Sequence, residues 1–397
     1  MSLGFESAGF DVACAVEIDA VHAAAHKYNF PRTTIIQKSV EDISGTGIRS
    51  SSEIGSQKVS VVFGGSPCQG FSLIGKRSLD DPRNSLVRHF MRIVCELDAD
   101  YFVFENVKGL TVGKHRKFLD EIIECFSSNG YDLISPWKVL NASEYGVPQD
   151  RKRLFLVGCK KGLTLPTYPN PTTIPADKNV ISNDLPFGPN VFDAIGDIPD
   201  ADEYEELLAG DAVSVELGPP SHYSSILRGI TDDIYDYSYK RSYDSNLLTS
   251  SARTNHSKLS RSRFASQKHG TVEAVSRYLK LDPHGVCNTL RAGTDAKRGA
   301  FTAARPIHPS YPRCVTVREM ARLHSYPDWF RFNWTKWHGA REVGNSVPPF
   351  LARAVASAVI NALDVSPTKP ELVISLGEEH LLKFTPKQAE EFFRIKP

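Results

Sequence analysis

The sequence predicts an α/β protein with a mostly parallel sheet and a smaller loop-rich region. The first observation is the alternation of short apolar segments with helix-prone segments over residues 11–160. The second is a change of character near Gly162, where a Pro- and Thr-rich stretch begins. The third is the return of helical spacing at about Thr316. These observations predict an α/β domain whose two parts flank a region of different composition.

Each expected element has a local reason. Short apolar runs predict strands over residues 11–19, 58–65, 101–107 and 153–159. Amphipathic spacing predicts helices over 20–30, 84–98, 117–130, 316–327 and 348–363, with Asn84 as a cap, Gly130 as a stop and a proline pair at the last start. The chain also opens on a helix-like stretch, residues 1–10, although a doubly wound fold would place an earlier strand before it.

Composition limits the class of protein. The 397 residues are 41% apolar, which is enough for two packed domains. The 47 basic and 46 acidic residues nearly balance, but residues 193–236 hold twelve acidic residues and one basic residue, whereas 240–298 hold twelve basic and four acidic. The basic run is typical of phosphate binding. Mutual neutralisation of the two runs is the alternative, and charge alone favours it.

The seven cysteines are scattered and none forms a C-x-x-C pair. This pattern argues against a disulfide framework and against a cysteine-rich zinc site, so we expect reduced thiols and no metal. No apolar run approaches the roughly 20 residues of a membrane span, and the N-terminus lacks the layout of a signal peptide. The sequence therefore predicts a soluble intracellular protein.

Three polar residues follow apolar runs. Glu17, Cys68 and Glu105 all lie just past apolar runs, and ligands of such sheets bind at the carboxyl ends of the strands. Arg151 and Arg153 alternate with strand spacing, so they share a face with Gln149. Taken singly, the cysteine could be a small core residue, the glutamate an exposed acid and the arginines a solvated turn. A cysteine, a carboxylate and an arginine pair together at strand ends indicate a functional site more specifically than any one of them alone.

A thiol, a carboxyl and a guanidinium at one site suit chemistry on cytosine. A thiolate that adds to carbon 6 makes carbon 5 of the ring enamine-like and able to accept a methyl group. A carboxylic acid that donates to ring nitrogen 3 stabilises this addition, and an arginine can hold the exocyclic oxygen. The base must leave the duplex first, because its reacting edge is buried there.

The order of five motifs resembles the DNA (cytosine-5) methyltransferases of the bacterial modification type. These motifs are "GGSPCQGFS", "ENV", "QDRKR", "TVREMARLHSYP" and "GNSVPP". The resemblance implies a Rossmann-like sheet that uses S-adenosylmethionine, with a smaller loop-rich target-recognition domain. It places the catalytic domain at 1–165, target recognition at 166–315, a return segment at 316–364 and an extension of unassigned role at 365–397.

The resemblance also implies residue roles. The catalytic set comprises Cys68, Glu105, Arg151 and Arg153. The cofactor set comprises Glu17, Ile18, Asp42, Ile43, Pro67, Leu86, Asn345 and Ser346. The DNA-binding set comprises Gln69, Gly70, Phe71, Ser72, Gln149, Thr289, Leu290 and Arg291. Arg318 and Glu319 are expected to organise the scaffold between domains.

Two departures from the family pattern matter. The strand and Phe-x-Gly-x-Gly loop of the first cofactor motif are absent, so we expect the full protein to be a methyltransferase and this chain to bind cofactor poorly. Micromolar affinity for S-adenosylmethionine in calorimetry would contradict the second expectation. His324 stands where the family usually carries Gln, a change that a scaffold position can absorb.

Two alternatives stay open at this point. A related enzyme could act on tRNA, but that branch carries a Cys-Phe-Thr signature, whereas Cys287 here precedes Asn288 and Thr289. A DNA-binding module that has lost catalysis is the other alternative, although a pure binder has no need of Cys68, Glu105 and Arg153 together. The favoured reading is an enzyme that acts on double-stranded DNA as a monomer in the bacterial cytoplasm.

Overall fold

The computed structural model describes residues 1–65, 85–111, 115–178, 184–293 and 305–395. Its largest sheet has the strand order β3 (Val61–Gly65), β4 (Tyr101–Val107), β8 (Lys152–Lys160) and β5 (Tyr131–Leu133), and β6 (Lys138–Asn141) also pairs with β8. Strands β3 and β4 are parallel, whereas β8 runs antiparallel to β4, β5 and β6. The expectation of a mostly parallel sheet is therefore wrong for this sheet. The short connection between β6 and β8, residues 142–151, is shorter than a parallel crossover needs.

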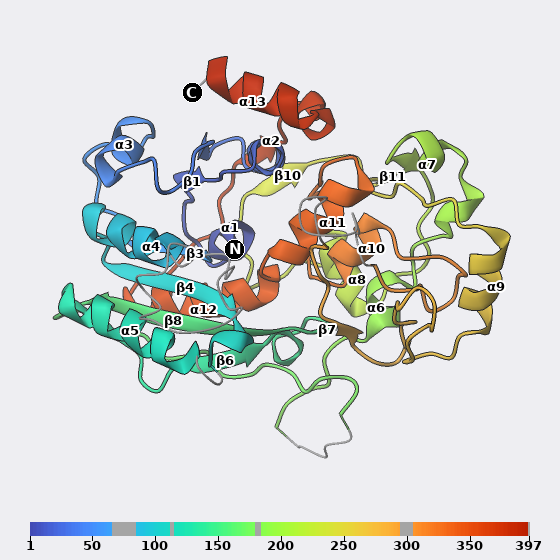
Figure 1. The fold of residues 1–397 in the computed structure, drawn as a ribbon, viewed down its shortest axis with the longest axis horizontal. Coiled ribbons are helices and arrows are strands. Elements are labelled where there is room, and N and C mark those ends of the chain that lie inside the picture. Colours follow the sequence, from blue (N-terminus) through green and yellow to red (C-terminus); the bar gives the residue numbers. More distant parts are fainter. Residues whose placement is uncertain (66–84, 112–114, 179–183, 294–304, 396–397) are drawn as a thin grey trace.

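Both faces of this sheet are covered, as Figure 1 shows. Helices α4 (Ser85–Glu96) and α5 (His115–Ser128) pack on one face, where Phe102 and Phe104 of β4 join their apolar core. Helices α1 (Ser2–Ser7) and α12 (Pro349–Ala362) pack on the other face, against Tyr101 and Val103. The alternation of side chains along a strand explains this division, and burial on both faces explains why β4 is apolar throughout its first half.

A second, two-stranded sheet lies beside the first. Strands β1 (Cys14–Val16) and β2 (Thr34–Ile36) are parallel and are connected by α2 (Ala20–Asn29). Asp19 caps α2, because its carboxylate accepts the backbone N–H groups of Val21 and His22 at 3.0 and 3.3 Å. In the part of the chain that the structure describes, no strand pairing joins this sheet to the five-stranded one. Helix α3 (Gly45–Ser50) follows β2.

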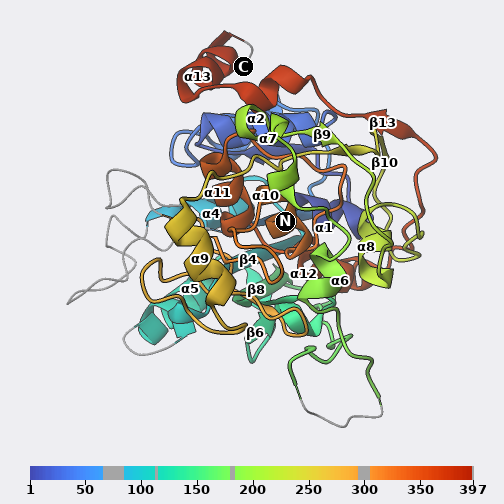
Figure 2. The ribbon, with the colours of Figure 1, turned by 90° about the vertical axis from the view of Figure 1, so that its right-hand side faces the viewer.

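The middle region is built from short elements that share one core with the return segment. The elements up to its last strand are α6 (Val191–Ile195), α7 (Glu206–Ala209), β9 (Val213–Ser214), α8 (His222–Leu227), β10 (Lys240–Ser242), β11 (Leu247–Leu248), α9 (Lys258–Ser266) and β12 (Cys287–Asn288). Apolar side chains of α6, α8, β9, β11 and β12 pack with those of α10 (Val317–Arg322) and α11 (Lys336–Asn345), whereas Phe264 of α9 packs in a separate cluster with Ile307 and Cys314. Strand β12 pairs with β7 (Gln149–Asp150), which lies next to β8 in the chain. Figure 2 shows these elements gathered beside the sheet domain.

The acidic and basic runs partly neutralise each other. Arg261 of the basic run lies 2.6 Å from the carboxylate of Asp202, which belongs to the acidic run. Arg263 pairs with Glu273, and the buried Lys280 donates to the carbonyl of Phe264. This part of the charge asymmetry therefore serves the protein's own packing, in line with the alternative stated above. The exposed cations that the described part of the run retains include Lys258, Lys268, Arg277 and Arg291.

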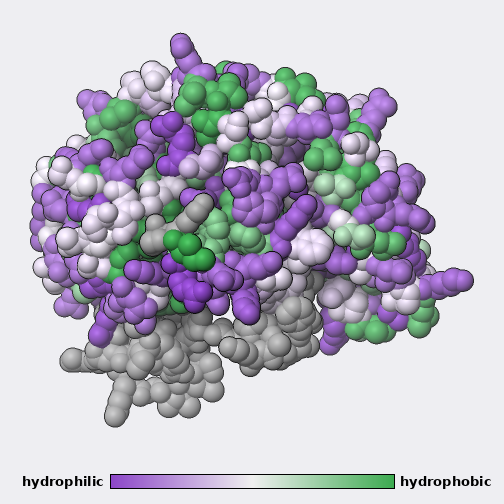
Figure 3. All heavy atoms as spheres, turned by 90° about the horizontal axis from the view of Figure 1, so that it is seen from above, coloured by the Kyte–Doolittle hydropathy of each residue, from purple (hydrophilic) through white to green (hydrophobic). Residues whose placement is uncertain are grey.

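The extension forms regular structure of its own. It contributes β13 (Val373–Ser375), a 3₁₀ turn η6 (Glu379–Lys383) and α13 (Pro386–Ile395). Further 3₁₀ turns are η3 (Lys108–Thr111), η4 (Ala142–Glu144) and η5 (Ala201–Glu203). Figure 3 views the molecule from the side of α13, where apolar residues lie in separate patches among hydrophilic ones.

One helical stretch of the described residues, Lys336–Ala362, is long and apolar enough to cross a membrane by composition. It comprises α11 and α12, and 61% of its most apolar window is buried inside the protein. Burial of this kind is what a core helix also shows, so the stretch is weak evidence for a membrane span.

Candidate active site

The end of β4 carries a buried acid that lies against a glycine. Gly65 and Glu105 are partners in the register of β3 and β4. A Cβ atom at position 65 would lie 2.5 Å from Oε2 of Glu105, so a larger residue there would displace this carboxyl group from its place. The acid side chain is 13% exposed. The last residue of β3, Gly65, therefore leaves space for the Glu105 side chain.

Arg153 faces this acid from the neighbouring strand. Its Nε lies 2.8 Å from Oε1 of Glu105, and its own side chain is 12% exposed. Burial raises the pKa of Glu105, and the charges of Arg153 and Arg151 oppose that rise. A raised pKa favours the protonated acid, which is the form that can donate a proton. The pair therefore offers an acid and a cation side by side.

Arg151 has a different set of partners. Its guanidinium donates to the carbonyls of Leu290, Gly344 and Ser346 at 2.9, 2.8 and 2.7 Å. These carbonyls belong to the middle region, to the last turn of α11 and to the residue that follows α11. Burial lowers the pKa of Arg151 to about 9, and its Nε is buried without a hydrogen-bond partner. In this structure Arg151 joins three segments that are distant in sequence, whereas Arg153 alone contacts the acid.

Gln149 is fully buried, and its side-chain amide is hydrogen-bonded within the protein. Its Oε1 accepts the N–H of Leu290, and its Nε2 donates to the Leu323 carbonyl and lies 2.9 Å from Nδ1 of His324. Because Nδ1 faces a donor, His324 carries its proton on Nε2, which donates to the Ser346 carbonyl at 3.2 Å. Burial holds the pKa of His324 well below its usual value, so the ring is neutral.

The predicted DNA-binding residues therefore separate into two groups. Gln149 and Leu290 are buried, at 0% and 2% exposure, and have no surface to offer DNA in this structure. Thr289 is half-buried and donates to the Asp150 carbonyl at 2.7 Å, whereas Arg291 is exposed. Burial of a polar side chain requires satisfied partners, and Gln149 finds them in the scaffold. The residues 66–72, including Pro67, Cys68, Gln69, Gly70, Phe71 and Ser72, lie outside the described residues.

A close backbone approach links the segment 289–292 to the "GNS" motif. A Cβ atom at Gly344 would lie 2.4 Å from the backbone nitrogen of Ala292 and 2.5 Å from the carbonyl carbon of Arg291. Any larger residue at 344 would push these backbones apart. The glycine therefore allows Asn345 and Ser346 to lie beside the segment that carries Thr289 and Arg291.

The predicted cofactor residues lie on several elements. Glu17 follows β1, is half-buried and accepts the N–H of Asp19 at 2.9 Å. Burial raises the pKa of Glu17, and its two backbone hydrogen bonds oppose the rise. Ile18 is 65% exposed, Asp42 and Asn345 are exposed, Leu86 and Ser346 are half-buried, and Ile43 is buried.

The sequence analysis missed Glu342, on α11 three residues before Asn345. Its Oε2 accepts the N–H of Asn333 at 2.9 Å, and its Oε1 is buried without a hydrogen-bond partner. Burial raises the pKa of Glu342 well above its ordinary value, and the charges of Asp19 and Glu17 raise it further. The sequence signal that could have pointed to Glu342 was an acidic residue three positions before the "NS" motif. Glu342 is thus a third carboxyl group near those of Asp19 and Glu17.

Replacing Glu342 with glutamine should weaken the dependence of stability on pH. A raised pKa in the folded state gives stability that is fully present below about pH 4.5 and is lost as pH rises through the folded pKa. Glu342→Gln removes this loss, so its free energy of unfolding should gain on wild type by up to about 1.4 kcal/mol per pH unit in that window. Urea denaturation between pH 5 and 8 measures the difference. Glu371→Gln, at an exposed acid, is the control, and equal slopes in all three proteins would contradict the prediction.

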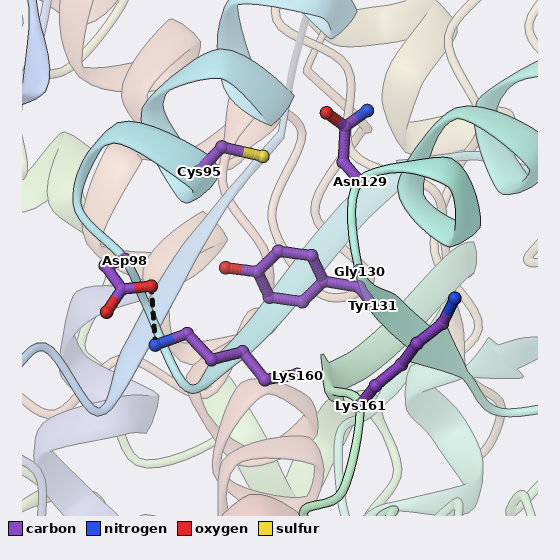
Figure 4. Close-up of a pocket in the computed structure, with 7 residues that line it drawn as sticks. All are labelled: Cys95, Asp98, Asn129, Gly130, Tyr131, Lys160 and Lys161. Carbon is purple, nitrogen blue, oxygen red and sulfur yellow. Dashed lines mark ion pairs between the residues drawn. The ribbon is translucent and has the colours of Figure 1, made fainter.

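The pocket at the other end of the main sheet is separate from this site. It has a volume of about 280 Å³ and lies near the start of β4 and the end of β8 (Figure 4). Cys95, Asp98, Tyr131 and Lys160 help to line it, and Lys160 is paired with Asp98 at 2.7 Å. Glu105 lies toward the opposite end of β4. Among the described residues, no cluster of three or more metal-ligating side chains occurs here or elsewhere.

Comparison with solved structures shows the class of protein. A crystal structure described as a DNA modification methyltransferase encoded within a prophage of E. coli matches with a TM-score of 0.70 at 31% identity, covering 92% of this chain and 96% of that one. The Dnmt2 methyltransferase of S. pombe shares the fold, with a TM-score of 0.51 at 16% identity, covering 89% and 92% of the two chains. The fold is thus that of an α/β methyltransferase.

Sequence comparison narrows the class to a family. Residues 1–361 match the C-5 cytosine-specific DNA methylases, and the chain belongs to that family. It is 54% identical to Type II methyltransferase M.XorII of Xanthomonas oryzae pv. oryzae over 395 residues, covering 100% of this chain and 90% of the relative. It is 34% identical to Type II methyltransferase M1.HphI of Haemophilus parahaemolyticus, covering 90% and 83%. The protein is a C-5 cytosine-specific DNA methyltransferase.

Proposed function

We propose that the protein transfers a methyl group from S-adenosylmethionine to carbon 5 of cytosine in one specific double-stranded DNA sequence, as the modification enzyme of a Type II restriction–modification system. The observation that carries the proposal is the contact between Glu105 and Arg153 beside Gly65, three residues before Cys68. The names of the two similar bacterial methyltransferases support the link to a Type II system.

Cys68 is the proposed nucleophile. Three residues of chain span at most about 11 Å, so Cys68 can reach a base that contacts Glu105 beside Gly65. The extruded cytosine accepts the thiolate at carbon 6, and base flipping exposes that atom. A neighbouring cation favours the thiolate form, and Arg153, which contacts Glu105, is the proposed cation.

Glu105 and Arg153 are proposed to hold and activate the ring. The protonated carboxyl of Glu105 donates to nitrogen 3, which neutralises the charge that builds up as the thiolate adds. Arg153 donates to the exocyclic oxygen from the same side. Arg151 is not proposed to contact the base, because its guanidinium donates to three backbone carbonyls. Its proposed role is to hold the segments around the site in place. Gln149 and His324 hold the same segments together.

The chemistry of the cofactor side fits S-adenosylmethionine. A carboxylate at the end of β1 can accept hydrogen bonds from ribose hydroxyls, and the exposed Ile18 side chain beside it offers an apolar surface for a purine. Asp42, Ile43, Leu86, Asn345 and Ser346 complete the proposed set, together with Pro67. The cofactor supplies an electrophilic methyl group, and these residues orient it toward carbon 5.

Double-stranded DNA is the proposed macromolecular substrate. Arg291 is exposed and Thr289 is half-buried, so the segment 289–291 is proposed to contact the bases. Lys258, Lys268 and Arg277 are exposed cations for phosphates. The segment 69–72 is proposed to close over the extruded base. We propose a monomer acting in the bacterial cytoplasm without a metal.

Bisulfite sequencing tests the proposal directly. DNA from bacteria that express the protein should contain conversion-resistant cytosines at one position of one short sequence. Cells that express Cys68→Ala, and cells with an empty vector, should show full conversion. Full conversion in cells with the intact protein, or methyl label that appears only in tRNA, would contradict the proposal.

A further inference from the structure

The family match ends at residue 361, so it assigns no role to residues 365–397. In both ribbon views the last helix, α13, lies beside α2 (Figures 1 and 2). Helix α2 begins at Ala20, two residues after the proposed cofactor residue Ile18. The extension thus packs on the helix that follows the cofactor strand.

Apolar packing fastens the extension to α2. Leu381, Leu382, Ala389 and Phe393 share one buried cluster with the alanines and Tyr28 of α2. Gly377 donates its N–H to the Tyr28 carbonyl at 2.8 Å, and a Cβ atom at 377 would lie 2.8 Å from Cα of Tyr28. The two backbones therefore approach more closely than a side chain at 377 would permit.

The same segment holds the start of α11. The Leu382 carbonyl accepts Nδ2 of Asn333 at 2.9 Å and the N–H of Trp334 at 3.1 Å. Asn333 also donates its N–H to Glu342 and accepts from Thr335, which caps α11. Arg331 pairs with Glu379. Helix α11 leads directly to Asn345, so the extension reaches the second cofactor element as well.

A third contact ties the extension to the middle region. Strand β13 pairs in parallel with β10, with Ile374 opposite Arg241. Arg241 forms a buried ion pair with Glu6 of α1 and stacks over the Trp329 ring at 4.6 Å. Helices α1 and α2 and the loop before α11 are therefore bound through a single C-terminal segment and its partner strand.

We propose that residues 373–395 form a brace that positions Glu17 and Asn345 relative to each other and thereby sets the affinity for S-adenosylmethionine. Strands β1 and β2 have no described pairing with the five-stranded sheet, so side-chain packing must fix the place of α2. The brace supplies that packing from a part of the chain that lies outside the family match. The inference rests on the proposed cofactor site.

Two variants in the full chain test the brace. Phe393 is 7% exposed in the cluster with α2, and Ile395 on the same helix is 68% exposed. Because this chain is expected to bind S-adenosylmethionine weakly, the calorimetric titration is run at high cofactor concentration: Phe393→Ala should weaken wild-type binding further by about tenfold, whereas Ile395→Ala should leave it within about twofold. Gly377→Ala, which forces the extension away from Tyr28, should act like Phe393→Ala. Phe393→Leu should recover most of the affinity.

Measurements of turnover, DNA affinity and circular dichroism distinguish a loss of cofactor positioning from a general loss of structure. In Phe393→Ala the turnover number at saturating cofactor and the affinity for target DNA should stay within about twofold of wild type, with an unchanged circular dichroism spectrum. Unchanged cofactor affinity in both folded variants, or equal losses in cofactor binding, DNA binding and turnover, would overturn the brace. A wild-type protein that binds cofactor but transfers no methyl group would overturn the proposed function alone.

Discussion

Replacing Cys68 with alanine is expected to reduce methyl transfer at least about 10³-fold, since the step that activates carbon 5 needs the thiolate. The rate of transfer from labelled S-adenosylmethionine to target DNA measures the loss. DNA that carries 5-fluorocytosine at the target should trap wild type as a covalent adduct, and Cys68→Ala should give none. The change removes one sulfur atom, so DNA affinity should be nearly unchanged.

Cys95→Ala is the matched control for this experiment. Cys95 is a half-buried thiol on α4 that lines the pocket at the far end of the main sheet. Burial raises the pKa of Cys95, which disfavours its thiolate. The control should keep near-normal turnover and form the adduct. An adduct that persists in Cys68→Ala would show that another group is the nucleophile.

Replacing Glu105 with glutamine is expected to lower turnover by about 10² to 10⁴-fold and to change its response to pH. Wild type needs the protonated acid, so its rate should fall as pH rises through the raised pKa of Glu105. Glutamine cannot ionise, so the residual rate of Glu105→Gln should lack this alkaline decline. Single-turnover rates between pH 6 and 9 give both profiles.

Replacing Arg153 tests whether the pH dependence of turnover belongs to Glu105. The charge of Arg153 lowers the pKa of Glu105, so in Arg153→Ala the decline should move to higher pH. Glu124→Gln, an exposed acid on α5, should behave like wild type. A decline that persists in Glu105→Gln would assign the titration to a different group.

Local patterns predicted most of the elements that carry the site. The apolar runs that end at Gly65 and Val107 became β3 and β4, and the stop at Gly130 and the proline pair match the end of α5 and the start of α12. The predicted cap Asn84 lies outside the described residues. The alternation that puts Gln149, Arg151 and Arg153 on one face also holds, since Asp150 and Lys152 are the residues of this stretch that are more exposed. These features depend on near neighbours in the chain, which the sequence shows directly.

The different contacts of Arg151 and Arg153 could not be predicted from the sequence. Arg151 and Arg153 have the same spacing and the same chemistry, yet one contacts Glu105 and the other reaches carbonyls 139 to 195 residues away. Gln149 was expected to touch DNA and is instead buried against His324. Nothing in a local window tells which distant carbonyl will meet a given guanidinium.

The sequence by itself determined the family, through the order of its motifs, and the chemistry implied by a cysteine, an acid and arginines at strand ends. Only the tertiary structure decided which arginine meets the acid, that Arg261 faces Asp202, and that the C-terminal segment packs on α2. The physical reason is that periodicity and capping are local, whereas these contacts form between residues brought together by burial of a shared core. That burial also turns Glu105 from an ordinary acid into a candidate proton donor.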